Sequence, residues 1–360
     1  MWRPERSGVD DDGRAPVAAI IVSWNCARFL ADCLRSLDKL ERPPREVVVV
    51  DNASSDGALE LVRELFPHVR RVSSATNLGF CAANNLGIRA TRSPFVLVLN
   101  PDTRLEPDYL ERLLPAFDDP GVGIVAGKLL RFDARTLDSC GQSLARSRQP
   151  VDRGYGSADR GQFERDEEVF GCCGAAALYR RAMLEHVADP GREYFDETFF
   201  AFFEDLDLAW RARRLGWRAV YRHRAVGYHA RGGTSEGGGS RRRWAAMAAR
   251  STEVRFHIVK NRYLAILRND SLLGYLRDAP FIWTRDIATF LFLLLADRGV
   301  LGRLWRERGL LAGARARRRL DAGRSKHEVH RGSDCGASPG GEAGPRPLSN
   351  ARQRDGRGAP

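Results

Sequence analysis

The stretch FVLVLNPD at residues 95–102 decides the fold of this chain. Its first five residues are apolar and continuous, which is typical of a strand buried on both faces of a parallel sheet. Asn100-Pro101-Asp102 complete it, so an amide and a carboxylate stand at the carboxyl end of that strand. In open α/β sheets, ligands bind beside the carboxyl ends of the strands. By itself the triplet is a weak signal, because an Asp after a strand is most often a turn former.

Three apolar runs upstream end in the same way, and this repetition gives the triplet its weight. Each is followed by polar residues that can bind a ligand: Ser23-Trp24-Asn25 after 17–22, Asp51-Asn52 after 47–50, and Asn77-Leu78-Gly79-Phe80 after 69–72. Segments with apolar residues at helical spacing separate the runs. The alternation predicts an α/β fold with a parallel sheet covered on both faces. Right-handed crossovers would bring the four exits to one edge, which is therefore the predicted binding site.

The second half of the chain is less regular. Strands are expected at 122–126, 173–179, 218–221 and 225–228, and helices at 204–215 and 244–268. The polar, Gly-rich segment 133–168 is expected to form a loop over the site. A run of ten apolar residues, 287–296, is too short to span a bilayer. Within it Ile287, Phe290, Leu291 and Leu294 form a stripe on one helical face.

Charge and composition narrow the class of protein. The net charge is +12, and from Asp297 onward 15 Lys and Arg stand against 7 Asp and Glu, a net +8. A basic tail beside apolar helices favours contact with a membrane surface, and a solvated, disordered Arg-rich end is the alternative. Nucleic acid is not expected as a partner, because the chain has no aromatic-rich basic stripe. Seven cysteines without CxxC spacing argue against zinc or a disulfide framework.

An acidic cluster, Glu204-Asp205-Leu206-Asp207, begins the helix predicted at 204–215 and follows the aromatic run 199–203. Carboxylates in a first helical turn complement the helix dipole, which would make the cluster structural. An apolar surrounding also raises the pKa of a carboxylate and makes it a competent general base. The pattern alone leaves both interpretations open.

Together these motifs resemble the family 2 glycosyltransferases of the GT-A fold, above all the bacterial rhamnosyltransferase-like members. The resemblance runs from about residue 17 to about residue 269. It rests on the order and spacing of Ser23-Trp24-Asn25, the stretch 50–57, Asn77-Leu78-Gly79-Phe80, the stretch 84–87, Leu99 to Asp102, Gly174-Ala175, the stretch 203–208, and His229.

The resemblance implies a nucleotide-sugar site. Asp51 corresponds to the carboxylate that binds the pyrimidine base of the donor, and Asn52 and Asp56 would support its turn. The remaining residues that it assigns to substrate binding are Ser23, Asn25, Asn77, Gly79, Asn84, Asn100, and Gly174-Ala175 as a floor under the acceptor. Uridine and thymidine diphosphate sugars share the base edge that Asp51 would read, so the donor is expected to be a UDP- or dTDP-sugar.

The resemblance also implies a metal and a base. Asp102 corresponds to a ligand of a divalent cation, Mg²⁺ or Mn²⁺, while the first Asp of the usual DXD motif is Asn100 here. His229 corresponds to a further metal ligand, although a single His after a strand is more often structural. Asp205 corresponds to the general base that deprotonates the acceptor, and Glu204 is the alternative. A single base implies inversion at the anomeric carbon.

The expected architecture is one GT-A, Rossmann-like catalytic domain with a helical extension. A disordered N-terminus is expected at 1–15, the catalytic domain at 16–269 (nucleotide-sugar half 16–120, acceptor half 121–269), the membrane-associated extension at 270–320, and a disordered tail at 321–360. The expected function is transfer of a sugar, rhamnose being one candidate, to a saccharide or lipid-linked saccharide at the cytoplasmic face of the cell membrane. The alternatives are a nucleotide-sugar-binding protein without catalysis and, from the charge, a nucleic-acid-binding protein.

Overall fold

The structure, a computed structural model, describes residues 13–231 and 240–333. The elements of the first half are β1 (Ala15–Ser23), α1 (Ala27–Asp38), β2 (Pro44–Asn52), α2 (Ala58–Leu65), β3 (Arg70–Ser74), α3 (Gly79–Arg89), β4 (Phe95–Leu99), β5 (Thr103–Leu105), α4 (Tyr109–Leu113) and the 3-10 helix η1 (Leu114–Asp118). Those of the second half are β6 (Val122–Leu130), β7 (Leu137–Ser139), β8 (Gln142–Leu144), β9 (Pro150–Asp152), β10 (Glu167–Val169), β11 (Ala176–Arg180), α5 (Arg181–Val187), η2 (Glu197–Phe199), α6 (Glu204–Arg214), β12 (Arg218–His229), α7 (Ser240–Ala249), α8 (Thr252–Asn269), α9 (Leu272–Ala296), α10 (Arg298–Arg306) and α11 (Gly309–Ser333).

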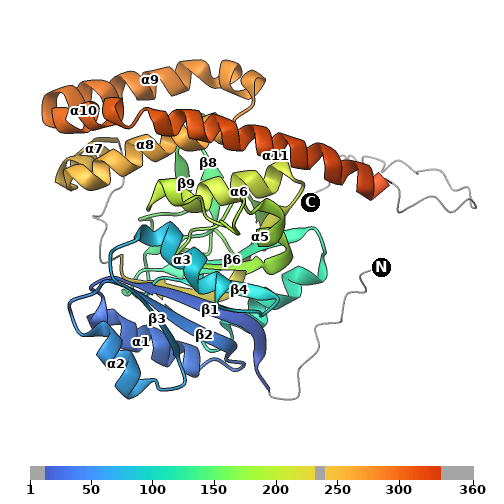
Figure 1. Ribbon diagram of the computed structural model, residues 1–360. Coiled ribbons are helices and arrows are strands. Elements are labelled where there is room, and N and C mark those ends of the chain that lie inside the picture. Colours follow the sequence, from blue (N-terminus) through green and yellow to red (C-terminus); the bar gives the residue numbers. More distant parts are fainter. Residues whose placement is uncertain (1–12, 232–239, 334–360) are drawn as a thin grey trace, which may run out of the picture.

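A mixed sheet forms the centre of the molecule (Figure 1). Strands β3, β2, β1 and β4 lie side by side and parallel, which confirms the parallel sheet predicted from the four apolar runs. Strand β11 pairs antiparallel with both β4 and β6, and β12 and β10 follow beyond β6. The parallel half thus carries the predicted strand exits, and the antiparallel half extends the same sheet.

Helices cover both faces of the parallel strands, as their unbroken apolar runs require. Successive residues of β1 point to opposite faces: Ile20 packs in one hydrophobic cluster with Ile88 of α3, and Ile21 packs in another with Leu30 of α1. Both isoleucines are fully buried. Burial of one such side chain contributes about 1.5–3 kcal/mol, so the two layers hold the edge of the sheet in a fixed position.

Three boundaries in the second half differ from the prediction. The segment 133–168 is not one loop, because it forms β7, β8 and β9 and enters β10. The two short strands before His229 are one strand, β12, whose register shifts between Arg222 and Val226. The helix predicted at 244–268 is two helices, since the Ser251 hydroxyl accepts a hydrogen bond from the amide of Val254 and caps the start of α8.

Helix α9 begins well before the apolar run 287–296. It has 25 residues, and it is the one helix in the described residues that is long and apolar enough to cross a membrane by length and composition. Helix α11 continues to Ser333, and Asp321 is buried in it, so the disorder predicted from residue 321 is wrong up to that point. Residues 1–12 and 334–360, the rest of the predicted disordered ends, lie outside the described residues.

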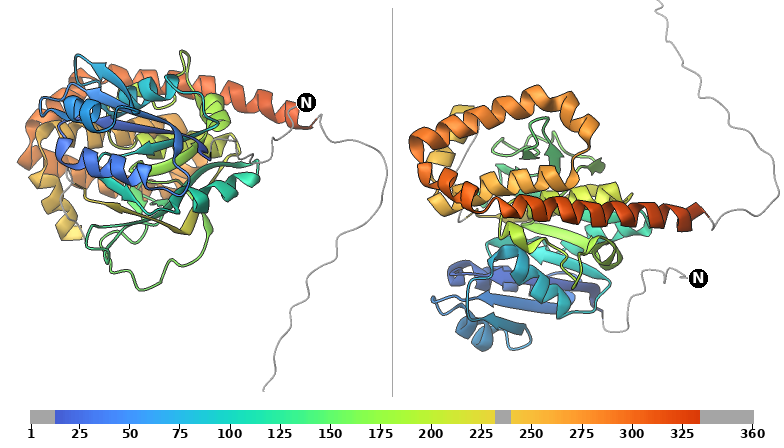
Figure 2. Two further views of the ribbon diagram at one scale, coloured as in Figure 1. Left: turned by 90° about the horizontal axis from the view of Figure 1, so that it is seen from below. Right: turned by 45° about the horizontal axis from the view of Figure 1, so that its top comes forward.

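Buried ion pairs join this extension to residues of the segment 121–269. Arg148, in the turn between β8 and β9, contacts Asp270 at 2.6 Å and Asp278 of α9 at 2.8 Å. Arg268 of α8 contacts Asp321 of α11 at 3.1 Å. Removing one partner of a buried pair costs about 3–5 kcal/mol, so these helices are part of the folded body. They lie on the side of the molecule away from α1 and α2 (Figure 2).

Candidate active site

The carboxyl ends of the parallel strands meet at one edge, as predicted. Ser23 at the end of β1 is in register with Asp51 of β2, and Ile21 of β1 is in register with Leu99 of β4. Asn100 therefore leaves the sheet beside these exits. The strand order, and not sequence proximity, brings the three polar segments together.

The antiparallel half adds two further groups to this edge. The amide of Asn100 donates to the carbonyl of Ala175 at 2.9 Å, which places the segment before β11 against the end of β4. Strand β12 pairs with β5 so that His229 lies opposite Thr103. The edge therefore combines the predicted donor residues with Gly174-Ala175 and His229.

Two buried oxygens at the ends of β1 and β2 lack hydrogen-bond partners within the described part of the chain. They are Oδ1 of Asp51, which is 6% exposed, and the hydroxyl of Ser23, which is fully buried. The other carboxylate oxygen of Asp51 accepts a hydrogen bond from the amide of Ser54 at 3.4 Å. A buried polar atom without a partner costs about 1–3 kcal/mol, so its retention at a sheet edge favours a ligand that satisfies it.

Asn25 and Asp56 hold together the loops that frame these oxygens. The amide of Ser55 donates to Oδ1 of Asn25 at 2.9 Å, and the amide of Ala27 donates to Oδ2 of Asp56 at 2.8 Å. Both side chains bridge the loop after β1 and the loop after β2. Their geometry supports a positioning role. Trp24, which precedes Asn25 in the chain, is 54% exposed.

Asn52 and Asn77 fix the start of α3. The Nδ2 group of Asn52 donates to Oδ1 of Asn77 at 2.8 Å, and that same oxygen accepts from the amide of Gly79 at 2.9 Å. Gly79 has φ +80°, and a Cβ there would lie 2.5 Å from the ring of Phe200, so only glycine fits. Asn84 is fully buried and donates to the carbonyl of Phe80. These residues therefore fix the position of α3 next to the edge of the sheet.

Asp102 and His229 face each other across the predicted metal position. Nε2 of His229 lies 3.2 Å from Oδ1 of Asp102 and 3.5 Å from the side-chain Nδ2 of Asn100, and Nδ1 lies 2.9 Å from Oδ2 of Asp138. Burial opposes the charged imidazole, but its hydrogen bonds to Asp102 and Asp138 outweigh this and raise the pKa of His229 to about 9. A carboxylate and an imidazole that lie this close together suit a divalent cation, and the hydrogen bond to Asp138 fixes the orientation of the His229 ring.

The protein alone supplies few ligands for such an ion. Within residues 13–231 and 240–333, no three His, Cys, Asp or Glu side chains are grouped closely enough to hold a metal. Asp102 and His229 could therefore supply two protein ligands to an ion at this position.

Asp138 and Asp152, which sequence reasoning missed, both contact Arg231. Arg231 contacts Asp152 at 2.8 Å and donates to Asp138, so its charge stabilises the two carboxylates. Two basic residues of α8 lie elsewhere: Lys260 donates to the carbonyl of Thr198, and Arg262 to that of Ser147. Asp138 and Asp152 could not be found from the sequence, because they come from short strands in the segment expected to be a loop.

The acidic cluster at the start of α6 separates into two parts. Asp207 is fully buried and bonded to Arg211 at 2.8 Å and to Asn269 at 2.7 Å, so the structural interpretation holds for it. Asp205 faces Gly174: its Oδ2 accepts from the amide of Gly174 at 3.2 Å and from Nε2 of Gln142 at 2.8 Å, and its Oδ1 accepts from the amide of Leu206 at 2.7 Å. Three donors thus orient one carboxylate at the edge.

The carboxyl group of Glu204 lies next to Asp205 but has a different environment. Its Oε1 would lie 3.8 Å from a Cβ on Gly174, and its Oε2 is buried without a hydrogen-bond partner in the described segments. Burial, and then the charge of Asp205, raise the pKa of Glu204 to about 8. Burial, and then the charge of Asp152, also raise the pKa of Asp205, but its three donors counteract this. Asp205 therefore loses its proton first, and Glu204 is neutral at pH 7.

The raised pKa of Glu204 predicts a loss of stability with rising pH. Between the ordinary pKa of a glutamate, about 4.3, and the folded value of about 8, the folded state holds a proton that the unfolded state has released. The melting temperature should therefore fall as the pH rises through this window, and Glu204→Gln should remove that part of the slope. Differential scanning calorimetry measures it, with the exposed Glu60→Gln as control. Parallel slopes for wild type and Glu204→Gln would contradict the assignment.

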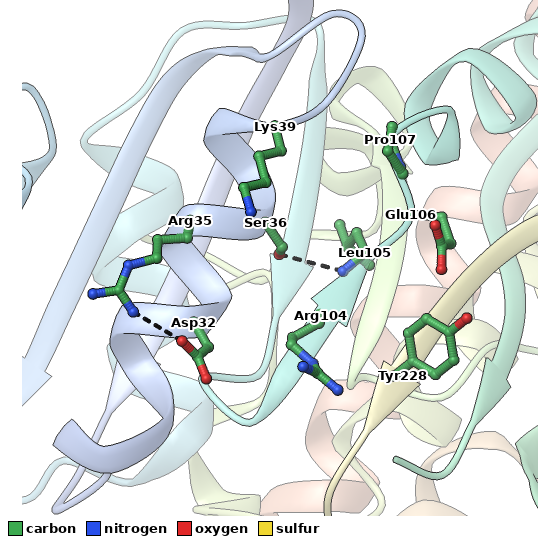
Figure 3. Close-up of a pocket in the computed structure, with 9 residues that line it drawn as sticks. All are labelled: Asp32, Arg35, Ser36, Lys39, Arg104, Leu105, Glu106, Pro107 and Tyr228. Atoms are coloured by element: carbon green, nitrogen blue, oxygen red, sulfur yellow. Dashed lines mark hydrogen bonds and ion pairs between the residues drawn. The ribbon is translucent and has the colours of Figure 1, made fainter. Parts of the chain in front are cut away.

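Two cavities lie near this edge. One of about 410 Å³ lies between α1, β5 and β12 and is lined by Arg35, Lys39, Arg104 and Tyr228 among others (Figure 3). Tyr228 is opposite Arg104 in the β12–β5 ladder, one position from His229, so the cavity opens on the other face of β12. A second cavity, of about 350 Å³, reaches Gln142 and hence the region of Asp205.

Comparison with known proteins identifies the family. A family model described as glycosyl transferase family 2 matches residues 18–188. The chain is 30% identical, over 57% of its own length and 72% of the relative, to N-acetylglucosaminyl-diphospho-decaprenol L-rhamnosyltransferase of Mycobacterium tuberculosis. The chain belongs to the family 2 glycosyltransferases. This glycosyltransferase is also 30% identical, over 62% of its length and 54% of the relative, to an N-acetylglucosaminyltransferase of Mesorhizobium japonicum.

A solved structure shows the same fold. The mannosyltransferase of Pyrobaculum calidifontis in complex with GDP-Man and Mn²⁺ matches with a TM-score of 0.50, covering 91% of this glycosyltransferase and 90% of that chain. The identity is 18%, so the likeness concerns the fold alone. It confirms the GT-A architecture that the sequence predicted.

Proposed function

We propose that this glycosyltransferase transfers a sugar, with rhamnose as the candidate, from a UDP- or dTDP-sugar to a lipid-linked saccharide in cell-surface polysaccharide synthesis. Transfer would invert the anomeric centre and require Mg²⁺ or Mn²⁺. The observation that carries the proposal is the Asp205 carboxylate, held by three donors beside Gly174, at the same sheet edge as the Asp102–His229 pair. A protein that only bound nucleotide sugars would not need an oriented, buried carboxylate there.

The relatives support the finer parts of the proposal. The Mycobacterium tuberculosis relative is named as a rhamnosyltransferase for an N-acetylglucosaminyl-diphospho-decaprenol, which motivates rhamnose and a lipid-linked acceptor. The Pyrobaculum calidifontis mannosyltransferase was solved with Mn²⁺, which motivates the divalent cation. Residues 16–269 would form the catalytic unit, and 270–320 would contact the membrane.

The donor would bind across the exits of β1, β2 and β4. Oδ1 of Asp51 would accept a hydrogen bond from the imide N–H of a uracil or thymine ring, and the Ser23 hydroxyl lies in register beside it. Asp102 and His229 would hold the divalent cation together with oxygens of the diphosphate. When bound, the cation stabilises negative charge on the departing diphosphate.

The acceptor would bind over Gly174, within reach of Asp205. Its hydroxyl oxygen would attack the anomeric carbon while Asp205 takes the hydroxyl proton. The bond between the anomeric carbon and the diphosphate breaks, and its electron pair leaves with the nucleoside diphosphate. Glu204, which is neutral at pH 7, would donate a hydrogen bond and not act as the base.

A screen of nucleotide sugars tests the proposal. Hydrolysis of the donor, measured as release of nucleoside diphosphate with and without Mg²⁺ or Mn²⁺, should occur for one uridine or thymidine diphosphate sugar and stop with a chelator. Tight binding of a nucleotide sugar without any turnover, even with acceptor extracts, would favour the binding protein without catalysis.

An exposed apolar face on α9 supports contact with a membrane surface. The predicted stripe Ile287, Phe290, Leu291 and Leu294 is 37–61% exposed, and Trp283 extends it. The other side of α9 carries Asp278 and Asp286, which contact Arg148 and Arg262. These contacts favour a helix that lies in the membrane interface and does not cross it. Exposed arginines follow in the chain and suit anionic lipid: Arg298, Arg306, Arg308, Arg315 and Arg319.

Vesicle co-sedimentation tests the membrane contact. Ile287→Asp with Leu291→Asp should weaken binding to phosphatidylglycerol vesicles by more than about tenfold, because each side chain loses roughly 1.5–3 kcal/mol of apolar burial. Both residues are more than half exposed, so the fold should remain intact. Leu65→Asp, equally exposed on α2 at the opposite end of the molecule, is the matched control (Figure 1). Equal binding of all three proteins, or none by the wild type, would contradict the contact.

A further inference from the structure

The turn that leads into α6 has an unusual backbone. Phe200 has φ +66° and ψ −64°, Phe202 has φ +71°, and Phe203 has φ +69° and ψ −2°. Positive φ is strained for residues with a bulky side chain, at about 1–3 kcal/mol each. Three such residues precede Glu204 and Asp205 directly, so the surrounding structure must hold this turn in place.

One side chain, Asn261 of α8, contacts three of the five residues 199–203. The two N–H bonds of its Nδ2 group are shared among three carbonyl oxygens of the turn: Phe199 at 2.9 Å, Ala201 at 2.7 Å and Phe202 at 2.7 Å. Asn261 has no exposed surface, and its Oδ1 has no hydrogen-bond partner among the described residues. Within the described residues, the side chain of Asn261 therefore forms hydrogen bonds through its NH2 group and not through its oxygen.

Neighbouring residues of α8 and α3 close the turn from both sides. His257 stacks on Phe200 with ring centroids 4.8 Å apart and an angle of 15° between the rings. From α3, the amide of Cys81 donates to the carbonyl of Phe200 at 3.1 Å, and Gly79 leaves room for the Phe200 ring. The turn is therefore fixed between α3 and α8.

We propose that Asn261 is a positioning residue for sugar transfer: it holds the strained turn 199–203 and thereby sets where the Asp205 carboxylate stands at the edge. The chain enters α6 directly from this turn. The carbonyl of Phe203 accepts a hydrogen bond from the amide of Asp207 at the start of the helix. A relaxed turn would rotate the start of α6, and the carboxylate would lose its alignment with Gly174 and Gln142. This inference rests on the proposed role of Asp205.

The test uses two variants in the full chain. Asn261→Ala removes the side-chain NH2 group that bonds to the turn. Asn261→Asp keeps the shape of the side chain but places a carboxylate oxygen against the three carbonyl oxygens, which repel it. We expect kcat to fall by about thirtyfold or more for both, while the dissociation constant of the metal-loaded donor changes by less than about threefold. A structural role alone would lower the melting temperature without separating kcat from donor binding. Asn269→Ala, a buried asparagine of the same helix that contacts Asp207 and not the turn, is the matched control.

Hydrogen–deuterium exchange provides a readout that does not depend on activity. Peptides that cover residues 199–207 should exchange at least about tenfold faster in Asn261→Ala than in the wild type, while peptides of β1 and β4 should be unchanged. Unchanged exchange in the turn, or full kcat in Asn261→Asp, would overturn the inference. A wild type without any transferase activity would refute the proposed function, and the exchange result would still decide whether Asn261 holds the turn.

Discussion

Asp205→Asn should lower kcat by roughly a hundredfold or more while donor binding persists. Asparagine keeps the size of the side chain, and its single oxygen can still accept from the amide of Gly174 and from Gln142, which both donate to Oδ2 of Asp205. It loses the bond that the amide of Leu206 donates to Oδ1, and it cannot take a proton from the acceptor. The proposed donor contacts of Asp51 and Asp102 would not be changed. Steady-state transfer and an independent titration of the donor measure the two effects separately.

Glu204→Gln is the matched comparison for this variant. Because burial and the charge of Asp205 keep Glu204 neutral at pH 7, its replacement by a neutral glutamine should change kcat by less than about tenfold. A normal rate for Asp205→Asn with a collapse for Glu204→Gln would transfer the role of base to Glu204. Normal rates for both variants would refute a mechanism with a single carboxylate base.

Asp102→Ala should abolish metal-dependent donor binding and lower transfer by about a thousandfold or more, because the cation contributes several kcal/mol to stabilisation of the leaving diphosphate. The fold should persist, since Asp102 follows β4 and its backbone carbonyl still accepts from the amide of Ala230. Isothermal titration of donor with Mg²⁺ and with chelator gives the binding part.

A surface carboxylate provides the control for Asp102. Asp38 contacts His68 on the exposed side of α1, so Asp38→Ala removes a charge of the same sign without reaching the edge. Near-normal turnover of Asp102→Ala in the presence of chelator would contradict the role of the metal. Equal losses in both variants would point to a general charge effect.

The parallel half of the fold could be predicted because its signals are local. The run 95–99 and its three counterparts are buried on both faces, so their apolar character is continuous and readable in one dimension. The residues at their ends converge because parallel strands connected by helices have their carboxyl ends on one side. The sequence therefore predicts that Asp51 and Asp102 lie at one edge of the sheet, where the structure places them.

The supporting groups could not be predicted, because their partners are distant in the sequence. Asp138 lies 91 positions from His229, Gln142 lies 63 positions from Asp205, and Asn261 lies about 60 positions from the turn that it holds. Short strands in a polar segment carry Asp138 and Gln142, and their apolar pattern is too brief to separate from a loop. Only the tertiary structure shows these pairs.

The C-terminal helices illustrate a different error. Residues 272–286 contain Arg277, Asp278, Arg285 and Asp286, and these charges hid the first part of α9 and left only the run 287–296 visible. Asp278 and Asp286 pair with Arg148 and Arg262, so they are compatible with a long helix. Because Arg148 and Arg268 join the extension to the body, point substitutions on the exposed face test membrane contact better than removal of the helices.

The stereochemistry of donor cleavage tests most directly the central claim, that one carboxylate base drives an in-line displacement at this edge. Proton NMR can identify the anomer that is released from the hydrolysed nucleotide sugar before it equilibrates in water. The mechanism predicts that the first sugar to appear has the configuration opposite to that in the donor, only with the divalent cation present. Release of the sugar with its original configuration would contradict a single displacement assisted by Asp205.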